Sequence, residues 1–436
     1  MNEQKPAKKA LLPILIFLIF YLGSGIYFEY INPPEGGMGF YVMSVVVAFV
    51  IALIVALLQN KELSFDEKIH ICAKGIGDDN ITIMLFIFLV AGAFSGVAGE
   101  AGGAKSTANL FLNIIPSNFI IPGFFIIACL ISMAMGTSVG TITVLVPIAL
   151  NVSSSAGLSL PLIVGTVVGG AMFGDNLSFV SDTTIAATKT QGVAMKDKFR
   201  VNFKIALPGA IITLIILTVI SSGTSSAELK TYEFNIWQTL PYFLVLLASL
   251  IGINVFAVLA SGTVLFGIVG ICTKSLTFQS FFSSMGAGTS GMFETMVVTI
   301  LVASIGALMK NNGGFSYILH VIKKNFKGTK GGMFGIGILT LLMDVATANN
   351  TVAIVLAAPI AKEIACEYKI EDKKVASLLD TFSCIAQGVI PYGAQLLIAA
   401  SLAKISSTEI IPYLFYQFIL LLMVIIWISV GKHKGK

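Results

Sequence analysis

The chain has 436 residues, of which 56% are hydrophobic and 11% charged, with a formal net charge of +5 and a mean hydropathy of +0.92. This composition leaves too little polar surface to cover a soluble globule and so excludes one. The apolar runs are uninterrupted, have the length of about 20 residues that a helix needs to cross a bilayer, and lack the alternation of a β-barrel. We therefore expect an all-α polytopic membrane protein.

The first apolar run, residues 11–28, follows Lys5, Lys8 and Lys9 and resembles the start of a signal peptide. It lacks a small-residue cleavage site and is long enough to span, so we interpret it as an extra N-terminal helix. Spans at residues 40–58 and 81–98 follow it. The five cysteines show no paired or metal-ligand spacing, and we interpret them as small apolar fillers.

Basic residues gather in some of the loops and are scarce in the others. The positive-inside rule places the basic loops in the cytoplasm, together with both chain termini. The basic loops are residues 5–9, 61–74, 189–204, 310–330, 362–374 and 432–436, and the lysine-poor loops are residues 32–39, 99–118, 151–159, 223–235 and 401–409.

The number of crossings must agree with this sidedness. Residues 119–150 satisfy it if they enter from outside and return, as a hairpin or a pair of short helices. An interrupted span at 160–188, a helix at 205–222 and a linking helix at 236–253 follow. In the second half, residues 331–365 must form a hairpin that enters from inside. The other predicted elements of that half are helices at 255–272, 293–309 and 411–431 and a span at 376–400.

The two halves thus have the same element order and opposite sidedness. TSVGTITVLVPIA, from Thr137, also resembles TANNTVAIVLAAPIA, from Thr347, if a gap of two residues precedes the proline. We predict a single membrane domain over residues 1–436 with inverted-topology repeats at 40–222 and 255–431, about ten transmembrane helices, two hairpins and interrupted helices. Inverted repeats are common in secondary transporters, where substrate sites lie at broken helices.

Four stretches have the composition of such breaks: residues 135–141, 174–184, 344–351 and 382–394. Each combines small or helix-breaking residues with oxygen-bearing side chains inside an otherwise apolar segment, and two come from each repeat. Na⁺ prefers oxygen ligands, and a buried carboxylate that loses its cation can carry a proton instead. We therefore place an ion site there.

The candidate ion- and proton-binding residues are Asp182, Asp175, Asp344, Ser181, Thr183, Asn176 and Ser178. Candidates at the discontinuous helices, for ion or substrate, are Thr137, Ser138, Thr141, Asn349, Asn350, Thr351, Asp380 and Gln387. The alternative for the aspartates is a structural role, as helix caps at Asp175, Asp182 and Asp344 and as an interfacial residue at Asp380. We interpret Lys189 and Arg200 as determinants of topology.

The stretch GDNLSFVSDTTIAATKTQG, from Gly174, resembles the NhaC family of Na⁺/H⁺ antiporters, which carry a glycine-aspartate pair followed by LS and by serine-aspartate-threonine-threonine. Those positions are Gly174, Asp175, Leu177, Ser178, Ser181, Asp182, Thr183 and Thr184. The resemblance implies an antiporter of the cytoplasmic membrane that moves Na⁺ out as H⁺ enters. Similar proteins move organic acids or amino acids with these ions, so a Na⁺- or H⁺-coupled transporter of an amino acid or carboxylate is the alternative.

Other functional classes find less support in the sequence. It has no HExxH motif or paired intramembrane histidines, so we do not expect an enzyme. An inverted repeat with broken helices fits alternating access better than a static pore. We expect the lipid bilayer, Na⁺ and H⁺ as partners, no nucleic acid and no cofactor, and a homodimer is one arrangement open to the chain.

Overall fold

A computed structural model gives the fold of residues 6–32, 34, 39, 42–116, 119–221, 232–251, 253–347, 349–391 and 393–431. The described residues form helices and connecting turns, with no strand among them, which confirms the all-α fold. Parts of several predicted segments lie outside the described residues: the start of the span at 40–58, residues 222–231, Tyr392, Lys5 and the basic residues at 432–436.

The helices of the first half are α1 (Leu12–Ile26), α2 (Val45–Leu58), α3 (Phe65–Ile76), α4 (Asp79–Glu100), α5 (Gly103–Ile114), α6 (Ile120–Met135), α7 (Ser138–Ala156), α8 (Leu160–Leu177), α9 (Asp182–Gln191) and α10 (Met195–Ser221). Those of the second half are α11 (Ile236–Leu250), α12 (Val255–Cys272), α13 (Phe278–Gly291), α14 (Phe293–Asn311), α15 (Gly314–Asn325), α16 (Gly328–Thr347), α17 (Asn350–Tyr368), α18 (Asp372–Gln387), α19 (Ala394–Ala403), α20 (Ser407–Ile410) and α21 (Phe415–Val430). Short helices η1 (Lys8–Leu11), η2 (Tyr27–Ile31) and η5 (Ile411–Tyr413) flank α1 and α21.

Several of these helices are apolar enough to cross a membrane. Within the described residues, five are long and apolar enough to span, and a sixth is formed if the bent pair Ala394–Ala403 and Ser407–Tyr413 counts as one span. Shorter apolar helices of 10–17 residues, such as α2, α6 and α21, accompany them. The chain is therefore a multi-pass membrane protein.

The structure corrects some predicted boundaries. Helices α3, α5, α13 and α15 occupy segments for which the sequence predicts loops or connections. Helix α10 begins at Met195 and not near residue 205, so part of the predicted basic loop 189–204 is helical and enters the protein. Polar and charged residues in these segments are as typical of amphipathic helices as of exposed loops, so composition alone does not distinguish the two.

All four predicted breaks are present. They lie at Gly136 and Thr137 between α6 and α7, at residues 178–181 between α8 and α9, at Asn349 before α17, and at residues 388–391 and Gly393 between α18 and α19. Three of the new helix starts have a side-chain cap, in which Thr137, Ser181 and Asn349 accept hydrogen bonds from the backbone N–H groups of Gly140, Thr184 and Val352. These caps satisfy donors that would otherwise be unpaired at a buried helix end.

The two halves pack in equivalent ways. Hairpin arm α6 lies on α8 as α16 lies on α18, while α7 reaches across to α19 as α17 reaches across to α9. The outer helices are also exchanged between the repeats: α2 of the first repeat packs on α14 of the second, and α12 of the second repeat packs on α4 of the first. The N-caps Thr137 and Asn349 are equivalent positions, and Pro147 and Pro359 then follow them at the same spacing. The predicted gap is therefore unnecessary, and the true partner of Thr137 is Asn349 and not Thr347.

Hydrogen bonds and an ion pair connect the helix ends into two groups, one at each end of the molecule. At one end of the molecule Asn60 donates to Asn312 (3.0 Å), and the ammonium of Lys310 pairs with Glu363. At the other end Asn113 donates to the carbonyl of Tyr232 (2.7 Å), and Ser275 donates to that of Ala101 (3.2 Å). The hairpin α6–α7 starts from the second end and α16–α17 from the first, which is the inverted arrangement.

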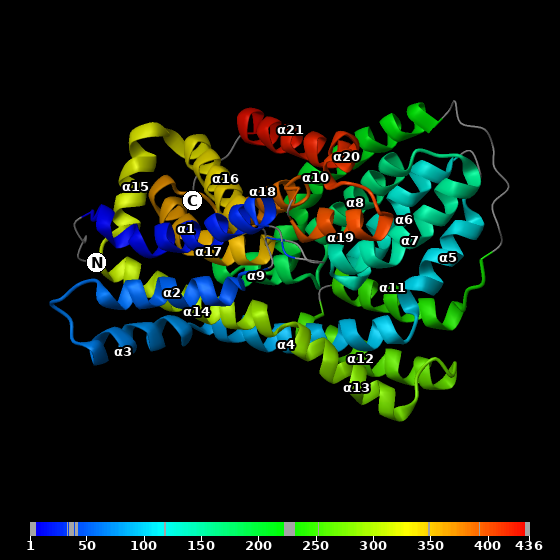
Figure 1. Ribbon diagram of the computed structural model, residues 1–436, viewed down its shortest axis with the longest axis horizontal. Coiled ribbons are helices and arrows are strands. Elements are labelled where there is room, and N and C mark those ends of the chain that lie inside the picture. The colour runs from blue at the N-terminus through cyan, green and yellow to red at the C-terminus, as the bar shows by residue number, and fades with distance from the viewer. Residues whose placement is uncertain are drawn as a thin grey trace.

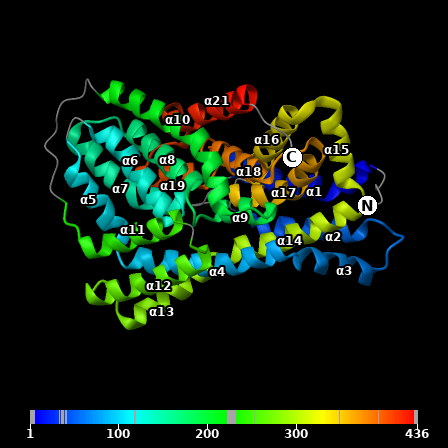
Figure 2. The same cartoon turned by 180° about the vertical axis from the view of Figure 1, so that it is seen from behind.

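The broken helices lie in the middle of the molecule. In Figure 1 and, from behind, in Figure 2, helices α2, α3, α4, α12, α13 and α14 line one long side, and the hairpins and broken spans lie against them. Helices α8 and α9 together form the span Leu160–Gln191, and its most apolar 18-residue stretch is completely buried inside the protein. A broken span can thus be enclosed by protein and kept from lipid, which is the condition for irregular backbone at membrane depth.

Candidate ion-binding site

The break between α8 and α9 brings Asp175 and Asp182 to opposite sides of a short non-helical segment. Ser178 stabilises this segment because its hydroxyl donates to the carbonyl of Met133 on α6 (2.9 Å) and accepts from the N–H of Val180 (3.1 Å). Ser181 caps α9 and also donates to the carbonyl of Asp175 (3.1 Å). The cap of α9 is therefore Ser181, which leaves the Asp182 carboxylate available for other contacts.

Asp175 is a buried carboxylate held by hydroxyl groups. Its side chain is 2% exposed, and its Oδ2 accepts a hydrogen bond from Ser138 at the start of α7 (2.8 Å). Thr183, in the first turn of α9, donates to its Oδ1 (3.4 Å) and lies 3.1 Å from the hydroxyl of Ser181. The carboxylate thus meets the tip of the first hairpin and the start of α9 together.

Asp182 meets the tip of the other hairpin. Its Oδ2 accepts a hydrogen bond from Thr351, in the first turn of α17 (2.7 Å), and its Oδ1 accepts from the backbone N–H of Thr183 (3.0 Å). Unlike Asp175, Asp182 is only partly buried. The two carboxylates that flank one break are therefore each connected to the tip of a different hairpin.

A buried ion pair lies next to these carboxylates. The ammonium of Lys198, on α10, is 2.6 Å from Oδ2 of Asp380, on α18, and both side chains are at most 1% exposed. Lys198 also donates to the carbonyl of Asn176 (2.6 Å) and to the hydroxyl of Thr184 (2.7 Å). Asn202 completes the cluster by donating to Asp380 (2.9 Å) and to the Asn176 carbonyl (3.1 Å).

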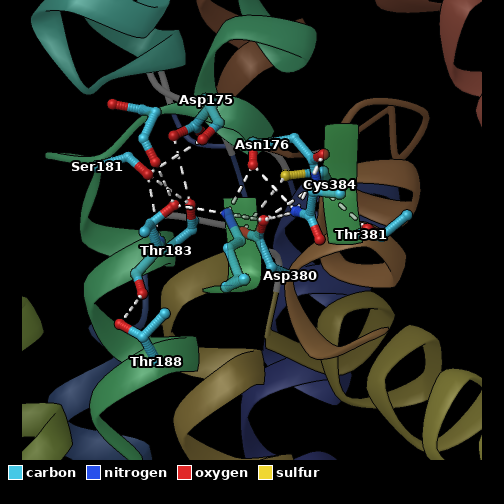
Figure 3. A network of polar contacts seen from close by, with 12 residues as sticks. Asp175, Asn176, Ser181, Thr183, Thr188, Asp380, Thr381 and Cys384 are labelled. Atoms are coloured by element: carbon cyan, nitrogen blue, oxygen red, sulfur yellow. Dashed lines mark hydrogen bonds and ion pairs between the residues drawn. The ribbon is translucent and has the colours of Figure 1, made fainter. Parts of the chain in front are cut away.

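Asn176 links the ion pair to the α8–α9 break. Its side-chain amide donates to Asp380 (3.0 Å) and to Thr381 (3.4 Å), while its carbonyl is one of the free acceptors at the end of α8 that Lys198 satisfies. Figure 3 shows Asp175, Ser181 and Thr183 on one side of this network and Asn176, Asp380 and Thr381 on the other. Elements from both repeats therefore meet in one connected polar cluster.

The broken span α18–α19 contributes amides where α8–α9 contributes carboxylates. Gln387, at the end of α18, donates to the side-chain oxygen of Gln395 on α19 (2.7 Å), and Gln395 donates to the hydroxyl of Ser138 (3.1 Å). Because Ser138 in turn donates to Asp175, a chain of hydrogen bonds connects the second broken span to the first.

Some predicted residues have local structural roles. Thr137 and Asn349 are the N-caps of α7 and α17, and Thr141 donates to the carbonyl of Thr137 (2.9 Å). Asn350 accepts from the N–H of Thr351 through its own side-chain oxygen (3.0 Å). These residues shape the hairpin tips, and none has a hydrogen bond to a site carboxylate among the described contacts.

Asp344 lies apart from the network. Its side chain is 0% exposed, and neither carboxylate oxygen has a hydrogen-bond partner among the described residues. The structure thus brings Asp175, Asp182 and Asp380 together and leaves Asp344 on its own.

Lys198, Asn202 and Gln395 were not among the candidates, and Thr184 was named only as a position of the family motif. A signal for the first two was present, because Lys198, Asn202, Ala206 and Ala210 recur every fourth residue and so form one buried face of α10. We interpreted the positive charges there as marks of a cytoplasmic loop. Gln395 carries no local signal, since its partner Ser138 belongs to the other repeat.

Three comparisons with known proteins agree with this architecture. The model of the "Na+/H+ antiporter family" matches residues 38–222 and 224–432. The malate-2H⁺/Na⁺-lactate antiporter of Bacillus subtilis is 22% identical over 88% of this chain and 89% of its own, and the Na⁺/H⁺ antiporter NhaC of the same organism is 23% identical over 79% and 84%. The YdaH transporter of Alcanivorax borkumensis has the same fold, with a TM-score of 0.64 over 99% of this chain and 100% of its own at 13% identity. Because the family model covers nearly the whole sequence, the chain belongs to the Na⁺/H⁺ antiporter family.

Proposed function

We propose that this protein exchanges Na⁺ for H⁺ across the cytoplasmic membrane by alternating access, with Na⁺ bound at Asp175 and Asp182. One observation carries the proposal: these carboxylates flank a break in a buried span, and each accepts a hydroxyl hydrogen bond from the tip of a different hairpin. Movement of one repeat against the other would change both contacts together, which is what a site exposed alternately to the two faces requires.

The balance of charge favours a cation at this site. Lys198 compensates Asp380, whereas Asp175 and Asp182 have no ion-pair partner in the part of the chain that the structure describes. Neighbouring carboxylates that are largely removed from water need a bound cation or protons to offset their charge. Occupation by Na⁺ and by H⁺ is then mutually exclusive, which is the condition for exchange and involves no cofactor.

The surrounding oxygens suit Na⁺. Ser138, Ser181, Thr183 and Thr351 place hydroxyl groups around the two carboxylates, and hydroxyl oxygens together with carboxylates are ligands for hard cations. We propose that these side chains form the coordination shell. Lys198 would then hold the α8–α9 break in shape through the Asn176 carbonyl.

A second candidate is coupled transport of a small organic anion. The malate and lactate named for one relative point to it, and so does a cavity of about 340 Å³ lined by Lys189, Asn254 and apolar side chains of α4 and α12. A single ammonium in an apolar cavity is suited to a carboxylate with a short hydrocarbon part. In that case Asp175 and Asp182 would bind the coupling ion.

Proteoliposomes containing a pH-sensitive dye distinguish these functions. We expect NaCl, but not choline chloride, to collapse an imposed pH gradient with the wild type, and Asp182→Asn to abolish the response. Asp197→Asn is the matched control, because Asp197 is 47% exposed at the start of α10, and it should behave as wild type. A response that requires malate, lactate or an amino acid together with Na⁺ would favour the second candidate, and no response to any solute would refute both.

A further inference from the structure

Asp344 is a buried carboxyl group that the proposed Na⁺ site does not use. It lies on α16, near the tip of the second hairpin, with a 0% exposed side chain and no hydrogen-bond partner for either oxygen among the described residues. The backbone of Gln387, at the end of α18, lies close to its carboxyl group. An ionised carboxylate in such a setting is strongly disfavoured, whereas a protonated one is tolerated.

The charged and titratable groups on the elements packed against α16 do not compensate Asp344. On α18 the nearest in sequence to Gln387 are Cys384 and Asp380, and the Asp380 carboxylate is already paired with Lys198. No ion pair joins Asp344 to any described residue. The remaining groups are Asp372, Lys373 and Lys374 on α18, Lys362, Glu363, Cys366, Glu367 and Tyr368 on α17, Tyr416 on α21, Tyr21 on α1 and Lys330 on α16.

The equivalent position in the first repeat shows what a proton would do at Asp344. Counted back from the N-caps Thr137 and Asn349, Asp344 corresponds to Ser132 on α6. Ser132 is also fully buried, and its hydroxyl donates to the carbonyl of Ala171 on α8 (2.6 Å). A protonated Asp344 has an O–H group to give to the backbone of α18, as Ser132 does to α8, and an ionised Asp344 does not. The second repeat therefore has a titratable donor where the first has a permanent one.

The same hairpin also contacts the proposed Na⁺ site. Asp344 is on arm α16, and Thr351, which donates to Asp182, is on arm α17 of the same hairpin. A shift of this hairpin when the cation leaves or arrives at Asp182 would therefore also change the surroundings of Asp344.

We propose that Asp344 is a proton-carrying site separate from the Na⁺ site at Asp175 and Asp182. It is loaded as the neutral acid while it is enclosed between α16 and α18. When the hairpin opens it to water, the carboxyl O–H bond breaks, the proton passes to a water molecule and the carboxylate is hydrated. This inference rests on the proposed exchange of Na⁺ for H⁺ and assigns a required step of the proton transport to a second position.

Two transport measurements on one protein test this proposal. Exchange of ²²Na⁺ for internal Na⁺ at equal pH needs the cation site alone, whereas Na⁺-driven proton movement also needs the proton carrier. We expect Asp344→Asn to retain ²²Na⁺ exchange within about twofold and to lose Na⁺-driven proton flux by about 100-fold, the order of loss seen when a proton-transferring group is removed. Asp344→Ser, which copies the residue of the first repeat, should give the same result if the asparagine variant does not fold.

The matched control is Ser132→Ala, which removes the equivalent hydrogen bond without removing a titratable group and should keep both activities. Loss of both activities in folded Asp344→Asn or Asp344→Ser would place Asp344 in the cation site and overturn the proposal. Retention of both would show that Asp344 is a permanently protonated structural residue and would overturn it as well. Failure of the wild type to exchange ²²Na⁺ would refute the proposed function itself, a separate result.

Discussion

At the scale of single residues, we expect disruption of the buried ion pair between Lys198 and Asp380 to lower the stability of the fold strongly. Both groups are removed from water, so deleting one partner leaves a buried charge uncompensated. We expect Lys198→Met or Asp380→Asn to lower the free energy of unfolding by about 3–5 kcal/mol. The double variant should be destabilised much less than the sum of the two single variants, because neither charge is then buried alone. Thermal unfolding in detergent measures all three.

The control for this prediction is Lys204→Met, which removes an exposed lysine from the same helix and should leave the unfolding temperature nearly unchanged. Additive losses in the double variant would contradict the ion pair.

The same residues show what sequence reasoning can and cannot find at this scale. Aspartates in apolar stretches are conspicuous, so Asp175, Asp182 and Asp380 were all among the candidates. Lys198 was not, because a lysine near the end of a span normally marks a cytoplasmic loop. Its partner lies on a helix of the other repeat, and no local pattern connects positions so far apart in the chain. The hydroxyls of Ser138 and Thr351 were candidates, but their pairing with different aspartates required coordinates.

At the scale of elements, the break between α6 and α7 depends on Gly136. Its φ of +70° is a left-handed conformation, and a Cβ built there would lie 2.8 Å from the backbone carbonyl carbon of Val180 in the α8–α9 break. We expect Gly136→Ala to combine about 1 kcal/mol of backbone strain with about 1–3 kcal/mol of overpacking and to reduce Na⁺-driven proton flux per folded molecule. Thermal unfolding and the proteoliposome assay measure the two effects.

Gly157 provides a matched comparison. It has a φ of +63° at the end of α7, but a Cβ there would meet nothing within 4 Å. Gly157→Ala should therefore show the strain alone, with normal transport. Equal losses of stability and transport in the two variants would mean that contact between the two breaks is unimportant.

Local composition identified the breaks well and the peripheral helices poorly. Glycine, serine, threonine and asparagine in an apolar frame predict unwound backbone because these residues favour caps and turns over helix interiors. The same reasoning failed for α3 and α15, whose charged residues lie on amphipathic helices and not in loops. It also misaligned the hairpins, since identical threonines at Thr137 and Thr347 suggested a match that the N-caps do not support.

At the scale of the whole molecule, the two groups of helix ends predict an orientation in the membrane. The end with Asn60, Lys310 and Glu363 carries the basic segments at 61–74, 310–330 and 362–374, and the positive-inside rule assigns it to the cytoplasm. Cys366, at the end of α17, belongs to this group, while Cys272, at the end of α12, lies close in sequence to Ser275 in the opposite group. Both thiols are exposed, whereas Cys72, Cys129 and Cys384 are buried.

A membrane-impermeant maleimide can therefore report the orientation. In Cys272→Ser, which retains Cys366, we expect labelling of inverted vesicles and not of right-side-out vesicles, and the reverse in Cys366→Ser. A permeant maleimide should label both variants in both preparations, which controls for the reactivity of each thiol. If each variant showed the labelling pattern expected for the other, the orientation in the membrane would be the reverse of the one predicted, and the inverted repeats would be unaffected. Labelling of both variants from the same side would contradict the arrangement of helix ends itself, and with it the argument that one site is exposed alternately to the two faces.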